Sequence, residues 1–208
     1  MNKMSKRNLK YSLKSNLKED SDNEDEDVGD ENVRRINNDI YFYSDVTTQS
    51  ILTLNSLIKN IEIESQILGI KLQIDPPPIR IHINSDGGEV FAALSAVDTI
   101  INCKIPIFSI VEGTAASAAT LISIVCDNRM ITKHSHMLIH QLSSESFWGK
   151  MNELEDEMQN LNRTMSVIKK IYLDNSKIES RKIDDILRKD LLWDSAKCKK
   201  MGLIDEIL

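Results

Sequence analysis

The chain has 208 residues, 41% of them hydrophobic and 28% charged, and its formal net charge is −6. This length fits one large domain, and the composition excludes a fully disordered or membrane-embedded chain and gives no support to nucleic acid as a partner. Three cysteines with no Cys-x-x-Cys spacing argue against a disulfide framework or a zinc knuckle, so we expect a cytoplasmic protein in a reducing compartment.

The N-terminal segment consists of two blocks of opposite charge. Residues 1–18 carry six bases and no acid, whereas residues 19–31 carry nine acids and no base. Such blocks bury too little apolar surface to offset chain entropy, so residues 1–36 are predicted to be a disordered charged arm before a folded domain at 37–208. The arm either solubilises the chain or serves as a docking or gating segment. Its basic start lacks the apolar run of a secretory signal but also resembles an organelle transit peptide, so an organelle stroma or matrix is the alternative location.

From residue 37 onward, short apolar runs alternate with helical periods, which is typical of an α/β domain. Residues 40–43 are predicted to form a strand, and a helix with apolar positions between 51 and 61 follows. Beyond a polar loop, strict alternation predicts a strand over 79–83, and the turn at Asp86-Gly87-Gly88 leads into a helix over 90–101. A further strand at 105–111 is expected to end at Gly113, and residues 117–125 are expected to form a short buried helix.

The last third of the chain begins with a short strand at 137–139. A long helix then starts near Trp148, with apolar residues at a spacing of three and four: Met151, Leu154, Met158, Leu161, Met165, Ile168 and Tyr172. So narrow a seam suggests that this helix packs lengthwise on another element or on another subunit. The alternative is ordinary packing of the helix within its own chain. Ser176 and Glu179 have the spacing of a capping box for a second helix. Asp194 is expected to cap a last short helix that Gly202 ends, before a strand at 203–204.

Two turns carry residues suited to acyl chemistry. Gly87-Gly88, at the end of a strand, either makes a tight turn or leaves backbone N–H groups uncovered for a developing oxyanion. Ser117 follows a strand and opens a helix, and its neighbours are small. It is therefore either an N-cap or a nucleophile that another chain can approach.

A nucleophilic serine needs a base, and His140 ends an apolar strand at a position suited to face a cleft. The other histidines are His82, His134 and His136. Because His134, His136 and His140 share strand parity, a metal site is an alternative, but no acid accompanies them at ligand spacing and we expect no metal. The acid that orients the base is left open by spacing among five residues: Asp174, Asp184, Asp185, Asp190 and Asp194.

Four blocks, in this order, resemble the ClpP family, the proteolytic subunits of the ATP-dependent Clp protease. They are residues 83–88 (INSDGG), 113–118 (GTAASA), 137–141 (MLIHQ), and Lys189-Asp190 followed by residues 201–205 (MGLID). The resemblance implies that Ser117 is the nucleophile, His140 the general base and Asp190 the acid that orients it. It also implies that the amides of Gly88 and Ala118 form an oxyanion hole.

The same resemblance implies a ClpP/crotonase-like ββα spiral with a protruding handle helix. The apolar seam from Met151 to Tyr172 lies at the position in the chain where this handle helix is expected. The activity implied is that of a serine endopeptidase that cuts unfolded polypeptides and needs no cofactor. The enzyme would work inside a homo-oligomeric barrel of heptameric rings, a tetradecamer when two rings stack, fed by an ATP-dependent AAA+ unfoldase. Two alternatives remain: a catalytically silent ring or scaffold subunit, and a crotonase-like acyl-CoA enzyme, which has no need of the three side chains.

The sequence departs from the family pattern at several places. Asp86 and Leu142 replace prolines that are usual there, and residues 65–78 look like an insertion. Residues 143–149 keep one glycine where the family commonly has a glycine-rich strand. Ala118 stands where family members often carry Met, but its backbone N–H is unchanged.

Overall fold

A computed structural model describes residues 30–143 and 148–208. Within these ranges, six strands form a continuous sheet in the order β1-β2-β3-β4-β5-β8: β1 (Val33–Ile36), β2 (Asp39–Phe42), β3 (Ile79–Ser85), β4 (Ile107–Ala116), β5 (Asn128–Ile131) and β8 (Glu206–Ile207). β6 (His136–Leu138) pairs with the end of β4, and β7 (Trp193–Asp194) pairs with β6. β1 is antiparallel to β2, and β2, β3, β4, β5 and β8 run parallel, so their carboxyl ends meet at one edge.

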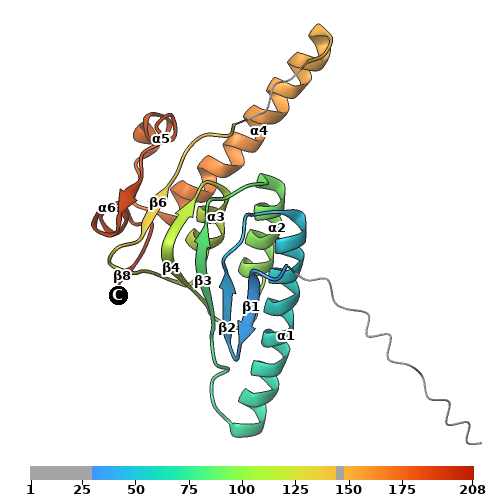
Figure 1. The fold of residues 1–208 in the computed structure, drawn as a ribbon, viewed down its shortest axis with the longest axis vertical. Helices are drawn as coiled ribbons and strands as arrows, with labels where there is room; N and C mark the ends of the chain where they lie inside the picture. Colours follow the sequence, from blue (N-terminus) through green and yellow to red (C-terminus); the bar gives the residue numbers. More distant parts are fainter. Residues whose placement is uncertain (1–29, 144–147) are drawn as a thin grey trace, which may run out of the picture.

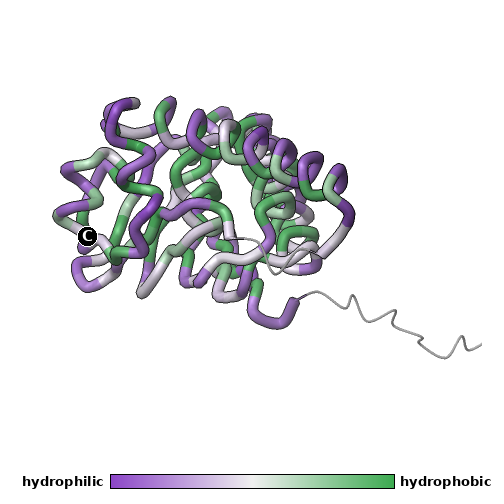
Figure 2. Tube along the Cα trace, turned by 90° about the horizontal axis from the view of Figure 1, so that it is seen from above, coloured by the Kyte–Doolittle hydropathy of each residue, from purple (hydrophilic) through white to green (hydrophobic). Residues whose placement is uncertain are grey.

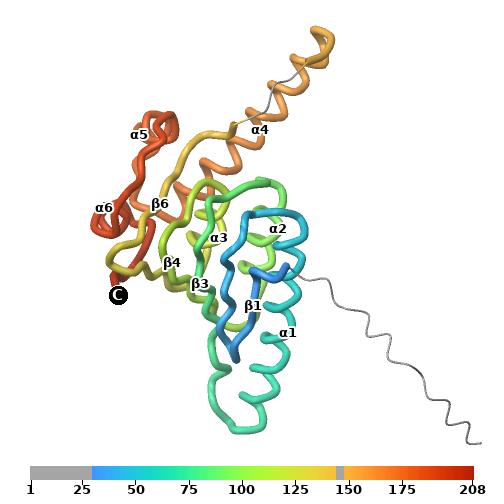
Figure 3. Tube along the Cα trace, viewed as in Figure 1, coloured from blue at the N-terminus to red at the C-terminus, as the bar shows by residue number. Residues whose placement is uncertain are grey.

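The helices connect and cover these strands. They are α1 (Thr48–Leu72), α2 (Val90–Ile101), α3 (Ala118–Ile124), α4 (Met151–Asn175), α5 (Ser180–Leu187) and α6 (Ser195–Met201). Figure 1 shows α4 leaving the body of the molecule, and the trace in Figure 3 shows α5 and α6 beside β6, on the side away from α1. Among the described residues, no helix combines the length and apolar character that crossing a bilayer requires.

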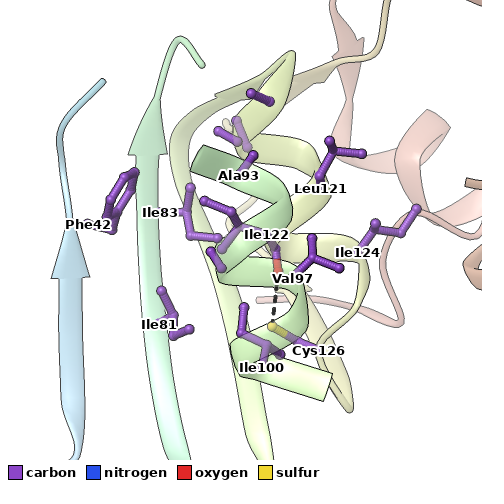
Figure 4. Close-up of a cluster of buried hydrophobic side chains, with 14 of the residues drawn as sticks. Phe42, Ile81, Ile83, Ala93, Val97, Ile100, Leu121, Ile122, Ile124 and Cys126 are labelled. Carbon is purple, nitrogen blue, oxygen red and sulfur yellow. Dashed lines mark hydrogen bonds between the residues drawn. The ribbon is translucent and has the colours of Figure 1, made fainter. Parts of the chain in front are cut away.

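The core lies between the sheet and helices α1 to α3. Alternate side chains of β3, at 79, 81 and 83, are fully buried. Figure 4 shows Ile81 and Ile83 on the side of the strand that faces Val97 of α2 and Ile122 of α3. The view from above shows hydrophobic segments gathered between the helices and the strands, with hydrophilic turns at the rim (Figure 2). This burial holds the ends of β3 and β4 in place, and both strands lead into the turns that the sequence singles out.

The folded domain starts before residue 37, which corrects the predicted boundary. β1 pairs antiparallel with β2 through a two-residue connection, Asn37-Asn38, with Asn37 at a φ of 55°. Residues 33–36 pair with residues 39–42 and Val33 is buried, so this segment belongs to the sheet. Arg34 and Arg35 make this edge strand look like part of the charged arm, although main-chain pairing with β2 decides its structure. The rest of the predicted arm, residues 1–29, lies outside the described residues.

β4 passes through Gly113 and ends only at Ala116, so the prediction that Gly113 breaks the strand was wrong. Gly113 has a φ of 90°, and its N–H donates to Ser135 Oγ at 2.6 Å. The Asn84 side chain accepts from the Thr114 N–H at 3.1 Å, where the register between β3 and β4 shifts. Glycine therefore accommodates an irregularity within the strand.

Ser176 does not cap α5, so the predicted capping box is wrong. Ser176 Oγ instead donates to the carbonyl of Tyr172 at 2.6 Å and closes the end of α4, while α5 begins after Glu179. The last strand also lies later than predicted, at Glu206–Ile207, and residues 203 and 204 before it are buried in the core.

The caps predicted for the last helix are confirmed. Asp194 Oδ1 accepts from the Lys197 N–H at 2.7 Å at the start of α6, and Gly202 ends the helix with a φ of 73°.

Candidate active site

Four chain segments meet at the carboxyl edge of the sheet. The Gly87-Gly88 turn follows β3, Ser117 lies between β4 and α3, His140 follows β6, and Asp190 follows α5. β6 pairs with the end of β4, and the Ser117 N–H donates to the carbonyl of Leu138 at 2.8 Å. Strand pairing therefore sets the separation of Ser117 from His140.

The structure brings together the three side chains predicted for catalysis. His140 Nε2 is 2.7 Å from Ser117 Oγ, and His140 Nδ1 is 3.0 Å from Asp190 Oδ1. A carboxylate only accepts hydrogen bonds, so Asp190 favours the tautomer with the proton on Nδ1. Nε2 is then an acceptor for the hydroxyl proton of Ser117, which is the arrangement that a general base requires.

Asp190 is held near His140 by contacts at the end of α5. The Gln141 N–H, next to His140, donates to the carbonyl of Leu187 at 2.7 Å. The Lys189 N–H donates to the carbonyl of Ile186 at 3.1 Å, which turns the chain toward Asp190. The Asp190 carboxylate is exposed to solvent, whereas the His140 ring is three-quarters buried.

Ser117 occupies the N-cap position of α3 without acting as a cap. Its side chain makes no capping hydrogen bond to the described residues and contacts His140 instead. Its backbone has a φ of 52° and a ψ of −124°, a conformation that L residues rarely adopt. Gly87 packs directly against this turn, where an added Cβ would lie 2.6 Å from the Ala116 carbonyl oxygen and 2.8 Å from Ser117 Cβ. The strained turn thus depends on a glycine from the neighbouring strand.

The two amides predicted for an oxyanion hole border the same cleft. Val46 pairs across the Gly88 turn by donating to the Gly87 carbonyl and accepting from the Glu89 N–H, each at 2.7 Å, and neither bond uses the Gly88 N–H. Ala118 is the first residue of α3, where backbone N–H groups lack a partner within the helix.

The cleft has a volume of about 210 Å³, and its lining includes Gly88, Ser117, Ala118 and His140. The arrangement can therefore bring backbone donors near a carbonyl that Ser117 attacks.

The other candidate residues lie elsewhere. Asp194 caps α6, and the remaining three acids form ion pairs with lysine or arginine at the surface: Asp174 with Lys170, Asp184 with Lys169 and Asp185 with Arg188. His82 lies between Asp39 and Glu112, and His136 lies on β6. Within the described ranges, no three His, Cys, Asp or Glu side chains gather as a metal site.

Sequence reasoning missed the residues that enclose the cleft on its apolar side. Leu121, Ile168 and Tyr172 line it, and the last two belong to the seam of α4. Burial raises the pKa of the Tyr172 phenol. The seam spacing predicts that Ile168 and Tyr172 are buried, but not that they face the candidate site, because that depends on how α4 packs on α3.

Comparison with known proteins identifies relatives over most of the chain. The family model described as Clp protease matches residues 35–208. The ATP-dependent Clp protease proteolytic subunit of Streptococcus mutans serotype c is 32% identical over 147 residues, which cover 69% of this chain and 75% of that protein. The subunit of the same name from Deinococcus radiodurans is 28% identical over 148 residues, covering 70% of this chain and 72% of the relative.

Among solved structures, a mutant of ClpP1 from Listeria monocytogenes is similar, with a TM-score of 0.72 and 22% sequence identity. The similarity covers 83% of this chain and 91% of that one. At this identity the comparison shows the fold alone, and it confirms the predicted ClpP-like α/β architecture.

Proposed function

Since the chain belongs to the Clp protease family, we propose that it is a serine endopeptidase with Ser117 as nucleophile, His140 as general base and Asp190 as the residue that orients His140. The observation that carries this proposal is the pair of contacts from the His140 ring, to Ser117 Oγ at 2.7 Å and to Asp190 at 3.0 Å. The relatives named as proteolytic subunits support the same reaction class.

The reaction follows from this geometry. His140 Nε2 accepts the Ser117 hydroxyl proton as Oγ bonds to the scissile carbonyl carbon, and the carbonyl π electrons move to oxygen. The amides of Gly88 and Ala118 stabilise that oxyanion. His140 then gives its proton to the leaving amine as the peptide C–N bond breaks. Water, deprotonated by His140, hydrolyses the acyl-enzyme and returns Ser117 to its hydroxyl form.

We further propose that the subunit assembles through α4 into rings that stack as a barrel. The first half of α4 keeps Met151, Leu154 and Met158 exposed, a surface that a second subunit would cover. The proposed substrates are unfolded polypeptides, delivered by an ATP-dependent unfoldase as the names of the relatives suggest. The three cysteines are unpaired, which agrees with a cytoplasmic location.

The test is labelling with a fluorophosphonate, which reacts with an activated serine. The wild-type chain is expected to gain one adduct at Ser117 and to cleave a denatured protein, and Ser117→Ala is expected to lose both properties. Ser56→Ala is the matched control, because Ser56 Oγ donates to the Leu52 carbonyl on the exposed face of α1 and does not line the cleft. Labelling that persists in Ser117→Ala would exclude Ser117 as nucleophile. A wild-type chain that assembles but takes no label would be a silent ring subunit.

A further inference from the structure

Two hydroxyl groups connect α4 to the turn that carries Ser117. Thr120 Oγ1 lies 2.6 Å from the carbonyl oxygen of Ser117 and 2.5 Å from the Tyr172 hydroxyl oxygen. A carbonyl oxygen can only accept, so Thr120 donates its proton to Ser117. The Thr120 oxygen then accepts from Tyr172. The direction of both hydrogen bonds is therefore fixed.

Both hydroxyl-bearing side chains are shielded from water. Thr120 is fully buried and Tyr172 is 1% exposed. Because burial raises the pKa of the Tyr172 phenol, this group stays protonated and remains a donor at neutral pH. Hydrogen bonds in such a low-dielectric setting are stronger than in water, and successive bonds polarise one another.

The chain of hydroxyls ends on the peptide unit that contributes to the proposed oxyanion hole. The Ser117 carbonyl and the Ala118 N–H belong to one planar peptide group, so fixing the carbonyl also fixes the direction of the N–H. That carbonyl accepts a second bond, from the Thr120 N–H at 3.0 Å. Donors on the carbonyl oxygen also polarise the peptide and make its N–H a stronger donor.

We propose that Thr120 and Tyr172 are positioning residues for the oxyanion hole, holding the peptide between Ser117 and Ala118 so that its amide meets the developing negative charge. The inference rests on the proposed function of Ser117. The hydroxyls of Thr120 and Tyr172 act through this peptide. Because the Tyr172 side chain also lines the cleft, Tyr172→Phe is the variant of choice: it removes the hydroxyl and keeps the ring.

The first experiment measures kcat and KM on a short fluorogenic peptide for Tyr172→Phe, Thr120→Val and Thr120→Ser. We expect kcat to fall about 2- to 10-fold in Tyr172→Phe, the effect of one neutral hydrogen bond, with KM unchanged. Thr120→Val breaks both bonds and is expected to lose more, whereas Thr120→Ser keeps the hydroxyl and should retain most activity. The double variant Tyr172→Phe with Thr120→Val should be no worse than Thr120→Val alone, because both act through one chain of bonds.

A second measurement separates positioning from stability. A peptidyl trifluoromethyl ketone forms a hemiketal with an active-site serine, and fluorine NMR during a pH titration reports the pKa of its hydroxyl. In Tyr172→Phe the acid dissociation constant of that hydroxyl should fall by the same 2- to 10-fold factor, which is a higher pKa, because the oxyanion is less well stabilised. Ser109→Ala is the control. It removes a buried hydroxyl pair with Ser123, 3.0 Å apart, and should lower stability without moving the hemiketal pKa.

The outcomes distinguish the inference from its premise. Unchanged kcat and hemiketal pKa in both Tyr172→Phe and Thr120→Val, with Ser117 still labelled, would overturn the positioning role alone. A wild-type chain that forms no adduct would overturn the proposed function and this inference with it. Should Thr120→Val fail to fold, Tyr172→Phe decides the question, because it removes one oxygen atom and keeps the ring.

Discussion

Replacing the exposed apolar residues of α4 should prevent assembly without unfolding the subunit. Met151, Leu154 and Met158 are 72%, 39% and 60% exposed, whereas Ile168 and Tyr172, further along the same seam, are buried. Full burial of a Leu or Met side chain stabilises by about 1.5–3 kcal/mol, so covering the exposed fractions would contribute about 3–5 kcal/mol per subunit. Changing the three exposed residues to serine should therefore weaken association about 100-fold or more, at 1.4 kcal/mol per tenfold.

Sedimentation velocity and native mass spectrometry measure this effect directly. The wild type is expected to sediment as a large ring assembly, and the triple serine variant as smaller species with an unchanged far-UV circular dichroism spectrum. The matched control changes three exposed residues on the opposite side of α4 to serine: Asp156, Asn160 and Arg163. If the apolar variant assembles as the wild type does, or if the control variant dissociates equally, these three side chains do not form the contact between subunits.

Three further predictions follow from local contacts. Burial alone would raise the pKa of Glu62, but hydrogen bonds from Lys59 and the Lys104 amide lower it, so Glu62→Gln should cost about 1.5–3 kcal/mol near pH 7 in urea unfolding. The pKa of Glu62 is lower in the folded chain than in the unfolded one, so this stabilisation is complete above the ordinary Glu range and is lost as the pH falls through the lowered pKa. The difference should therefore shrink progressively in acid, and a constant difference would contradict it. Gly87→Ala should abolish fluorophosphonate labelling, since its Cβ would collide with the turn at Ser117; full labelling would show that the turn can shift. Asp194→Asn should keep labelling and cost about 1 kcal/mol at most as a weakened cap, and a large loss of labelling would make it the orienting acid in place of Asp190.

The sequence predicts those elements whose burial follows one period. Alternation places the strand at 79–83, and a three-to-four spacing places the helix at 90–101, because each buries one face against the core. It fails where tertiary contacts override local signals. Arg34 and Arg35 make β1 resemble the charged segment before it, so the strand is not recognised from composition. The Asn37-Asn38 pair, a sequence typical of a hairpin turn, was the one local feature that indicated β1. Gly113 stays within β4 because the side chains of Ser135, before β6, and Asn84, on β3, accept hydrogen bonds from the backbone N–H groups of Gly113 and Thr114.

Sequence reasoning reaches only part of the candidate site. Ser117 and His140 each follow a strand that the pattern predicts, while the choice of Asp190 over Asp194 required a resemblance to a known family. The link between Thr120 and Tyr172 spans 52 positions and depends on how α3 packs on α4. No local pattern carries that information, because both residues have an equally good explanation as parts of the core.

The candidate site combines two side chains fixed by paired strands with a third, Asp190, whose position depends on how α5 packs against the rest of the chain. Ser117 and His140 lie at the ends of paired strands, and a hydrogen bond from the Ser117 N–H to Leu138 fixes their separation at the backbone. The strain at Ser117, about 1–3 kcal/mol for such a backbone conformation, is sustained by that pairing and by the buried start of α3. Asp190 instead follows a helix of eight residues that reaches the site through the Gln141 amide bond and the Lys169–Asp184 ion pair at 2.5 Å. Loosening α5 would therefore alter the orientation of His140 while leaving the distance between the Ser117 and His140 backbones unchanged.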